Sequence, residues 1–268
     1  MGFRLLHYSD PHFGACDEVI AERAVEVARD WVPDLTLVSG DFTMRGRRRE
    51  FAAARDWFGR LPEPRVALPG NHDVPGLNHP WDRFFRPFRR YREAMGAEEG
   101  EWELGEVGAL LTLNSSTPFG WHADWSRGFL SPVQGHRLRV FFEARGGLKL
   151  LGMHHPVLAS GERERALVAP MALVKGALAA AGVDLVLAGH FHQSRLDVLP
   201  LGDDQQLVVS QAPSLCSTRL KGEPNGFHFL ELEQNRMRAE LWRWREGDFQ
   251  RVGERAFRKE GSRWLVAE

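Results

Sequence analysis

The chain has few cysteines and no long apolar run, and each shortage excludes a class of protein. Its 268 residues include only two cysteines, Cys16 and Cys216. Two are too few for a disulfide framework or a thiolate zinc site, so we expect ordinary packed residues. No apolar segment approaches the roughly 20 residues of a membrane helix, and the first residues lack the length of a signal peptide. We therefore expect no membrane span and a cytoplasmic location.

Neither positive nor negative charge predominates in the chain. The formal net charge is −1, which argues against a partner bound by electrostatics alone, so nucleic acid is not expected. Arginine outnumbers lysine 31 to 4, and the arginine-rich stretch 83–92 is therefore more simply interpreted as a solvated face. At 43% hydrophobic residues, the chain is long enough for one sizeable core. We expect a single domain spanning residues 1–268.

The first 70 residues alternate strand and helix patterns. Short apolar runs at 3–9, 34–39 and 65–69 predict buried strands, and apolar residues at helical spacing predict helices at 17–31 and 47–61, the first with Asp17 as N-cap. This β-α-β-α-β order is typical of an α/β protein in which helices cover a parallel sheet. Ligand sites in such folds lie at the carboxyl ends of the strands.

The middle and end of the chain depart from this alternation. Residues 76–100 predict an amphipathic helix, broken or bent near Pro87, that we interpret as a helical insertion over the edge of the site. Strands at 148–153 and 184–188 and helices at 132–145 and 170–181 resume the α/β pattern. From residue 195 onward, alternating apolar and polar residues predict antiparallel strands of a second sheet.

Polar blocks follow five of the predicted strands. They are Asp10-x-His12, Gly40-Asp41, Gly70-Asn71-His72-Asp73, His154-His155 and Gly189-His190-x-His192. Each block alone is a weak signal, but strands of one sheet would bring all five to one edge. The glycines permit sharp turns and close backbone approach just before the ligands.

The residue types in these blocks indicate which metals would bind. Carboxylates, imidazoles and one amide without thiolates suit Mn, Fe, Zn or Co, and do not suit calcium or an iron-sulfur cluster. Seven donors exceed what one tetrahedral ion requires, whereas one shared carboxylate would give each of two ions four ligands. Two such ions assist displacement at phosphorus and lower the pKa of a bridging water.

The ordered blocks resemble the calcineurin-like metallophosphoesterases, in particular the bacterial class III cyclic nucleotide phosphodiesterases and their glycerophosphodiesterase relatives. The resemblance covers residues 10–192. It implies a four-layer α/β/β/α sandwich of two mixed β-sheets flanked by helices. It also implies a centre of two divalent or mixed-valence metal ions.

The resemblance also implies roles by position. The first metal would be held by Asp10, His12 and His192, the bridge would be Asp41, and the second metal would be held by Asn71, His154 and His190. His72 would protonate the leaving oxygen or stabilise charge on the phosphoryl group, with Asp73 placed to orient it.

Three further residues are candidates for substrate binding. His154 comes directly off its strand and is the preferred ligand, which leaves His155 for the substrate side. Arg45 lies four residues past Asp41 in a block similar to Gly-Asp-x-x-Asp-Arg-Gly of phosphoprotein phosphatases, although Met44 replaces the second Asp. It binds phosphate or is a solvated residue of the next helix. His122 lies in a loop that could close over the site.

These features predict an enzyme. The leading hypothesis is hydrolysis of a small phosphodiester by attack of a metal-bridging hydroxide, with a 3',5'-cyclic nucleotide as the substrate that the resemblance implies. A nucleotide-sugar or lipid-linked pyrophosphatase is the alternative enzyme, in which residues 81–95 would form a headgroup or acyl channel. A non-catalytic binding scaffold is the alternative of another class, and a homodimer is left open.

Overall fold

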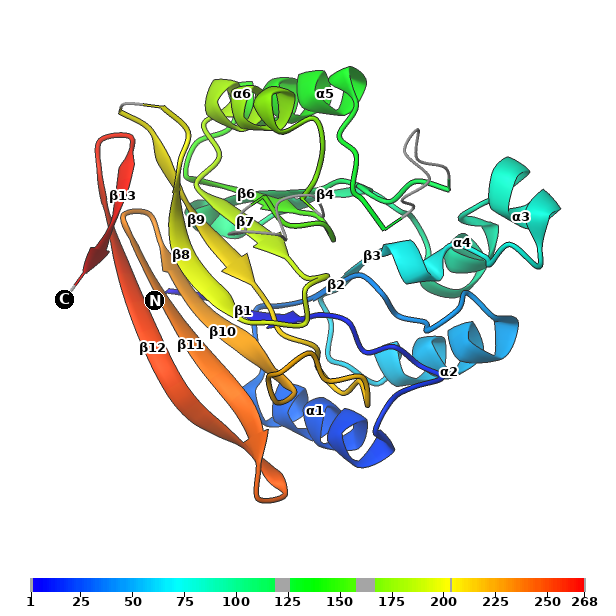
Figure 1. Cartoon of the computed structure of the whole chain (residues 1–268). Coiled ribbons are helices and arrows are strands. Elements are labelled where there is room, and N and C mark those ends of the chain that lie inside the picture. Colours follow the sequence, from blue (N-terminus) through cyan, green and yellow to red (C-terminus); the bar gives the residue numbers. More distant parts are fainter. Residues whose placement is uncertain (1, 119–125, 158–166, 203, 268) are drawn as a thin grey trace.

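Two β-sheets lie face to face, and helices cover the outer face of each (Figure 1). The structure, a computed structural model, describes residues 2–118, 126–157, 167–202 and 204–267. The layers follow the order helix, sheet, sheet, helix, which confirms the expected α/β/β/α sandwich. No helix within these ranges has the length and apolar character needed to cross a membrane.

The first sheet joins strands from both ends of the chain. Its parallel part consists of β1 (Phe3–Tyr8), β2 (Leu35–Ser39) and β3 (Arg65–Leu68). Its antiparallel part consists of β10 (Gly226–Glu233), β11 (Arg236–Arg245), β12 (Asp248–Glu260) and β13 (Arg263–Ala267). The two parts meet where β10 pairs with β1, and the order is β13-β12-β11-β10-β1-β2-β3.

The second sheet is built from the middle of the chain. Its strands, in spatial order, are β4 (Gly100–Glu103), β5 (Gly108–Thr112), β6 (Leu148–Gly152), β7 (Leu185–Ala188), β9 (Gln206–Gln211) and β8 (Arg195–Pro200). The central strands β5, β6, β7 and β9 run parallel, and β4 and β8 are antiparallel edges.

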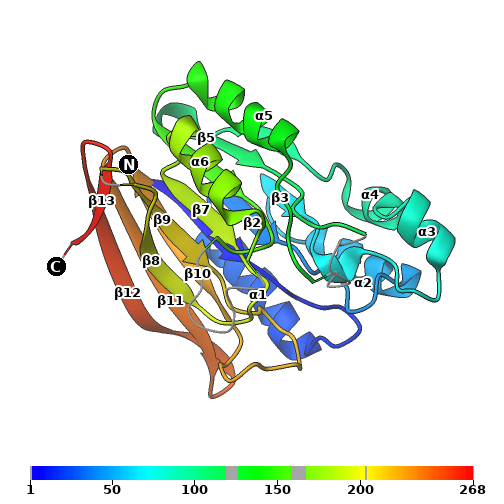
Figure 2. The same ribbon diagram turned by 45° about the horizontal axis from the view of Figure 1, so that its top comes forward.

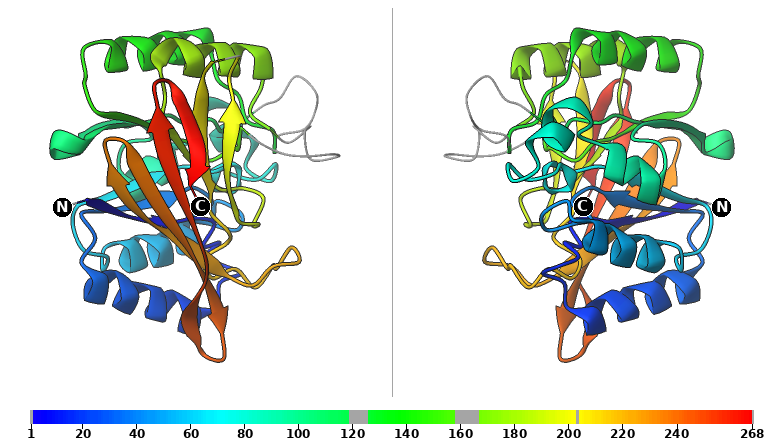
Figure 3. Two further views of the ribbon diagram at one scale, coloured as in Figure 1. Left: turned by 90° about the vertical axis from the view of Figure 1, so that its left-hand side faces the viewer. Right: turned by 90° about the vertical axis from the view of Figure 1, so that its right-hand side faces the viewer.

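Helices form the two outer layers of the sandwich (Figure 3). The helices α1 (Glu18–Trp31) and α2 (Arg48–Phe58) cover the first sheet, whereas α5 (Pro132–Glu143) and α6 (Met171–Ala181) cover the second. A third apolar cluster, rich in leucine and including Leu37 and Leu150, fills the space between the sheets. The carboxyl ends of the parallel strands are thus anchored by packing on both faces.

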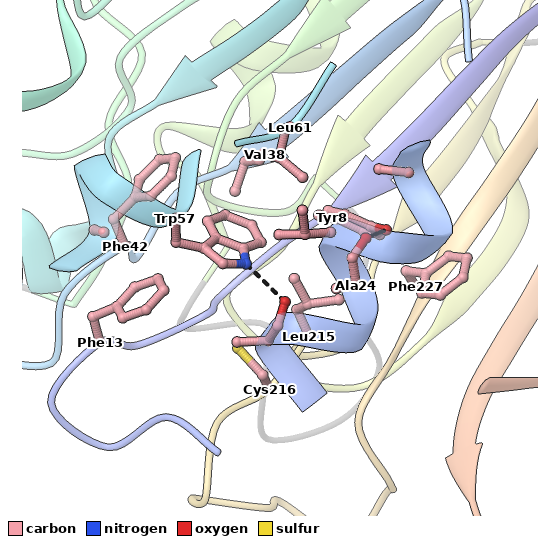
Figure 4. Close-up of a cluster of buried hydrophobic side chains, with 14 of the residues drawn as sticks. Tyr8, Phe13, Ala24, Val38, Phe42, Trp57, Leu61, Leu215, Cys216 and Phe227 are labelled. Carbon is pink, nitrogen blue, oxygen red and sulfur yellow. Dashed lines mark hydrogen bonds between the residues drawn. The ribbon is translucent and has the colours of Figure 1, made fainter. Parts of the chain in front are cut away.

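Hydrogen bonds as well as packing hold α1 and α2 together and α1 to the first sheet (Figure 4). The Asp17 carboxylate accepts from the first backbone N–H groups of α1, as predicted for an N-cap. Trp57 of α2 donates its indole N–H to the carbonyl of Ala21 at 2.9 Å, and the Tyr8 hydroxyl donates to the carbonyl of Ala24 at 2.8 Å. Each buried polar tip is therefore paired inside an apolar cluster.

The strands after residue 195 do not form a sheet of their own, and that part of the prediction is wrong. Strands β8 and β9 extend the second sheet, while β10 to β13 extend the first. Alternation along a strand depends on which face is buried and carries no information on which strand lies beside it. The sequence therefore predicts these strands correctly but not their partners.

Residues 76–100 form two short helices, α3 (Pro80–Phe85) and α4 (Arg89–Met95), on either side of Pro87. They lie at the end of the sandwich opposite the β12–β13 hairpin (Figure 2). Buried Arg90 ties them to the body, because its guanidinium donates to Asp82 at 2.8 Å and to the carbonyl of Gly46 at 2.9 Å. Two 3-10 turns, η1 (Asn71–Asp73) and η2 (Gly105–Val107), complete the described helical elements.

The two cysteines are free thiols in contact with each other. The Sγ atoms of Cys16 and Cys216 lie 3.1 Å apart, and Cys216 is buried.

Candidate metal centre

The five polar blocks converge, but they come from two sheets. Asp10, Asp41 and Asn71 follow β1, β2 and β3 of the first sheet, whereas His154 and His190 follow β6 and β7 of the second. The prediction of one shared sheet edge is therefore wrong. Convergence arises because the sheets face each other with the carboxyl ends of their parallel strands at the same end of the sandwich.

The ligand-bearing turns have an unusual backbone conformation. Seven non-glycine residues in the described ranges have positive φ, and five of them are predicted ligands: Asp10, His12, Asp41, His190 and His192. This left-handed region is sparsely populated by residues with a Cβ, and such strain concentrates at functional sites. The turns bond to one another, for example from the Asp10 N–H to the Gly40 carbonyl at 3.1 Å.

Asp41 lies between two groups of imidazoles. Its Oδ2 atom lies 3.6 Å from Nε2 of His12 and 3.4 Å from Nε2 of His154. Its Oδ1 atom accepts the backbone N–H of His72 at 2.8 Å. One carboxylate oxygen is therefore held by the backbone, and the other faces donors from both sheets.

Asp10 shows the same division between its two oxygens. Oδ2 accepts hydrogen bonds from the Ser9 hydroxyl at 2.5 Å and from the backbone N–H of His190 at 3.0 Å. Oδ1 is buried, lies 3.4 Å from Nε2 of His192, and has no hydrogen-bond partner among the described residues; Nδ1 of His12 is likewise buried and unpartnered. Unpaired buried polar atoms are costly, and a cation at this position would satisfy the Asp10 oxygen.

A second group of donors surrounds Asn71. Its Oδ1 atom lies 3.2 Å from Nε2 of His154 and 3.1 Å from Nδ1 of His190, and these two nitrogens are 3.3 Å apart. Nδ1 of His154 faces the carbonyl of Ser39 at 2.9 Å. A carbonyl only accepts, so Nδ1 is protonated, and a cation bound in this group would take the place of the proton on Nε2.

Asp41 lies within 3.6 Å of imidazole nitrogens from both groups. Potential ligand atoms of Asp10, His12, Asp41 and His192 lie within 4.8 Å of one another, as do those of His154, His155 and His190. All are buried. The chain therefore contains two clusters of His and Asp side chains suited to a dinuclear metal site.

His155 belongs to the second cluster by distance but not by chemistry. Its Nε2 faces the carbonyl of Ser126 at 3.0 Å and therefore carries the proton, while its Nδ1 lies 2.9 Å from the Ser115 hydroxyl. Both ring nitrogens are thus satisfied by protein groups, and the side chain is fully buried. The expectation that His155 contacts substrate is not supported, because the ring is buried and both of its nitrogens are engaged by Ser115 and Ser126.

His72 lies beside the first cluster, with its ring 4.9 Å from that of His12. Its Nδ1 faces the carbonyl of Met44 at 2.8 Å. The predicted orienting contact from Asp73 is not seen. Both Asp73 oxygens instead accept donors of Gly70, Phe42 and Thr43, so Asp73 fixes the turns after β2 and β3 and the Met44 carbonyl fixes the imidazole.

Arg45 lies at a cavity of about 400 Å³ that opens beside the cluster. Its lining includes Asn71, His72, Arg45, Arg47 and residues 76–79, and it contains no acidic residue. The Arg45 side chain is exposed. His122, the remaining candidate, lies outside the described residues.

The carboxylates and imidazoles of the centre shift one another's pKa values. Although burial raises the pKa of Asp10 and Asp41, nearby histidines lower it below the usual range of a carboxyl group. Burial alone would lower the pKa of His154, but the Asp41 and Asp10 carboxylates outweigh it and raise that pKa to about 9. Burial lowers the pKa of His12 and of His190 to about 3. The two buried carboxylates thus require nearby positive charge, which bound cations would supply.

Some supporting groups were not predicted. Ser9 donates to Asp10, and Ser115 fixes the His155 ring. No spacing rule singles out a serine that acts by hydrogen bonding to a ligand. The only available signal is the position of Ser9 directly before Asp10.

Comparison with known proteins agrees with this geometry. A family model described as calcineurin-like phosphoesterase matches residues 3–194, more than half of the chain. A probable cyclic nucleotide phosphodiesterase from Synechococcus sp. is 44% identical over 43 residues, and this match spans 16% of the chain and only 17% of that relative.

Solved structures share the fold. A dimetal phosphatase from Danio rerio superposes with a TM-score of 0.65 at 14% identity, covering 95% of this chain and 98% of that one. PhoD superposes with a TM-score of 0.73 at 10% identity, and the match covers 99% of this chain and 71% of the PhoD chain. At these identities the likeness shows the fold alone. The family match, together with the buried clusters, leads to one conclusion: the chain belongs to the calcineurin-like phosphoesterase family.

Proposed function

We propose that the protein is a metal-dependent phosphodiesterase with two ions in the buried centre. The observation that carries this proposal is the position of Asp41, whose Oδ2 faces His12 on one side and His154 on the other. One carboxylate between two groups of imidazole, carboxylate and amide donors, without a thiolate, favours a pair of first-row divalent or mixed-valence ions, such as Mn, Fe, Zn or Co.

The donors divide into two sets. Asp10, His12 and His192 would hold the first ion, Asp41 would bridge, and Asn71, His154 and His190 would hold the second. When bound, such ions supply Lewis acidity at a phosphoryl group and lower the pKa of coordinated water.

His72 is the proposed acid. Because the Met44 carbonyl accepts the proton on Nδ1, any proton exchanged with substrate must be carried by Nε2. Protonation of the leaving oxygen by this nitrogen would assist cleavage of an alkyl ester, whose alkoxide leaves poorly. Asp73 contributes by fixing the turns on which Asp41 and His72 lie.

The cavity beside His72 is the proposed site of the leaving group. Arg45 and Arg47 place positive charge there, and no acidic side chain lines it. An anionic substrate is therefore favoured over a cationic one. The short match to a probable cyclic nucleotide phosphodiesterase supports a 3',5'-cyclic nucleotide as the substrate to test first.

One observation favours a second candidate. The rings of Trp81 and Phe85 on α3 lie 4.3 Å apart and are exposed, and Leu77, also exposed, lines the cavity. We interpret α3 and α4 as an insertion in a single domain spanning residues 1–268, lying over the edge of the site. Its exposed apolar side chains would suit the acyl or base portion of a lipid-linked or nucleotide-sugar pyrophosphate.

Turnover on three substrate classes tests these proposals. Purified protein reconstituted with Mn²⁺ is assayed on 3',5'-cyclic nucleotides, glycerophosphodiesters and nucleotide-sugar diphosphates. We expect the highest kcat/KM on a phosphodiester, whereas preference for the diphosphates would favour the pyrophosphatase. No turnover of any phosphate ester by metal-replete protein would reject both and favour a binding scaffold.

A further inference from the structure

A chain of buried hydroxyl and imidazole groups crosses the apolar space between the two sheets and ends at Asp10. We call it the polar seam; in order, its members are Ser194, His228, Ser210, His7, Ser39 and Ser9. Five of them are buried, and Ser194 lies at the partly exposed outer end.

Each member contacts the next at hydrogen-bonding distance. From the outer end to the Asp10 carboxylate, the six contacts measure 2.8, 2.9, 3.0, 2.9, 2.9 and 2.5 Å. Alternative acceptors are farther away: the Ser39 carbonyl is 3.1 Å from the Ser9 hydroxyl, and the Tyr8 carbonyl is 3.4 Å from the Ser39 hydroxyl. The shorter contacts favour the unbroken chain.

The acceptor at the inner end fixes the direction of every hydrogen bond. An ionised carboxylate cannot donate, so Ser9 donates to Asp10 and its oxygen accepts from Ser39. The Ser39 oxygen must then accept from Nε2–H of His7, which leaves Nδ1 of His7 to accept from Ser210.

The same reasoning continues to the outer end. Since the Ser210 hydroxyl donates to His7, its oxygen accepts from Nδ1–H of His228, and Nε2 of His228 accepts from Ser194. Both imidazoles are neutral in this arrangement. Burial agrees with this assignment, because it lowers the pKa of His7 to about 3 and the pKa of His228 well below its usual value.

The polar seam also joins the two sheets repeatedly. His7 on β1 belongs to the first sheet, Ser210 on β9 to the second and His228 on β10 to the first, while Ser194 precedes β8 of the second. The leucine-rich packing around it has no directional preference, whereas hydrogen bonds specify one register. The position of one sheet relative to the other matters here because the proposed ligands come from both sheets.

We propose that the polar seam is a positioning network that sets the alignment of the two sheets and directs Oδ1 of Asp10 toward the first metal. This inference rests on the proposed function of Asp10 as a ligand. Its members touch neither metal nor substrate, and they act through the Ser9 hydroxyl on Oδ2. Hydrogen-bonded groups behind a ligand typically change metal affinity by 10- to 100-fold.

The first test reads the tautomers in the unsubstituted protein and uses variants only to assign the signals. Imidazole ¹⁵N chemical shifts of the full chain, assigned by comparison with His7→Gln and His228→Asn, report the tautomer of each ring. We expect a neutral Nε2–H tautomer for His7 and a neutral Nδ1–H tautomer for His228 near pH 7. The reverse pair of tautomers, or a charged ring at either position, would overturn the inferred direction.

The second test measures affinity for Mn²⁺ and Zn²⁺ by competition with a chelator. Ser9→Ala is expected to weaken binding by about 10- to 100-fold, and Ser210→Ala, four hydrogen bonds from Asp10, by roughly tenfold. Thr36→Val is the matched control, since Thr36 is a fully buried hydroxyl on β2 without a hydrogen-bond partner among the described residues. It should change affinity less than twofold.

The outcomes separate this inference from the proposed function. If the parent binds metal and hydrolyses phosphodiesters while Ser210→Ala binds metal as tightly as Thr36→Val, the seam has no positioning role and only this inference fails. If the parent itself binds neither ion, the proposed function fails, and the role of the seam toward a metal fails with it. The tautomer measurement then still decides the direction of the hydrogen bonds.

Discussion

Oδ2 of Asp41 lies 3.4 Å from Nε2 of His154, although Asp41 follows a strand of the first sheet and His154 a strand of the second. The same oxygen faces His12 at 3.6 Å. A change at Asp41 should therefore affect both metal positions together, which no other carboxylate of the centre would do.

Asp41→Asn is expected to reduce bound metal from two ions per chain to one or none. The amide removes the negative charge, and it places either a donor or a weaker acceptor where the bridging oxygen lies. Loss of one ion should lower kcat/KM by roughly 10²- to 10³-fold. Elemental analysis of dialysed protein gives the stoichiometry. Asp56→Asn, an exposed carboxylate on α2, is the control and should keep both ions.

His72→Ala should separate chemistry from metal binding. His72 reaches Asp41 through its backbone N–H, so both ions should remain bound. Turnover of a substrate with an alkyl leaving group should fall by about 10²- to 10⁴-fold, because loss of general acid catalysis has effects of this size. Turnover of bis-(p-nitrophenyl) phosphate should fall less, since nitrophenolate leaves without a proton. His79→Ala, which alters the same cavity, is the control. Equal losses on both substrates would contradict the assigned role.

Much of this centre could be predicted from the sequence, because the patterns that indicate it lie within a few residues of each candidate ligand. The strands before Asp10, Asp41 and Asn71 are short, mainly apolar runs, and polar residues soon after such a run mark the carboxyl end of a buried strand. The helix N-cap at Asp17 and the break at Pro87 are local in the same sense.

The errors concern choices among distant partners. His154 and His155 are adjacent and identical in type, and only the Ser39, Ser115 and Ser126 contacts distinguish the ring that faces the centre from the ring that supports a loop. Asp73 was expected to bond to its neighbour in sequence but instead bonds to a turn 30 residues away. Such pairings depend on the folded arrangement, which periodicity does not contain.

The buried histidines of the polar seam should make the protein acid-sensitive. Burial lowers the pKa of His7 from 6.5 to about 3. Between these values the unfolded chain binds a proton that the folded protein does not, so the free energy of unfolding decreases as pH falls below about 6.5. At pH 5 this single residue should reduce it by about 2 kcal/mol.

Denaturant unfolding at pH 7 and pH 5 measures this difference. His7→Gln removes the titrating group, so its loss of stability between the two pH values should be smaller than that of the parent by about 2 kcal/mol. Ser210→Ala also breaks the seam but keeps His7, and it should retain the parental pH dependence. Equal pH dependence in the parent and His7→Gln would show that His7 does not stay neutral in the fold.

Gly189→Ala tests how closely the two sheets must approach at the centre. A Cβ at residue 189 would lie 1.9 Å from the Ser9 Oγ and 2.5 Å from Oδ2 of Asp10, inside their hydrogen bond. One of these groups must move, and the Asp10 carboxylate should turn away from His192. We expect metal affinity to fall at least as much as in Ser9→Ala. Gly176→Ala in α6 is the matched control, because an added Cβ there meets no atom within 4 Å and should raise stability by about 0.5–1 kcal/mol. Parental metal affinity in Gly189→Ala would mean that the Ser9 hydroxyl does not position Asp10, whatever the stability of the variant.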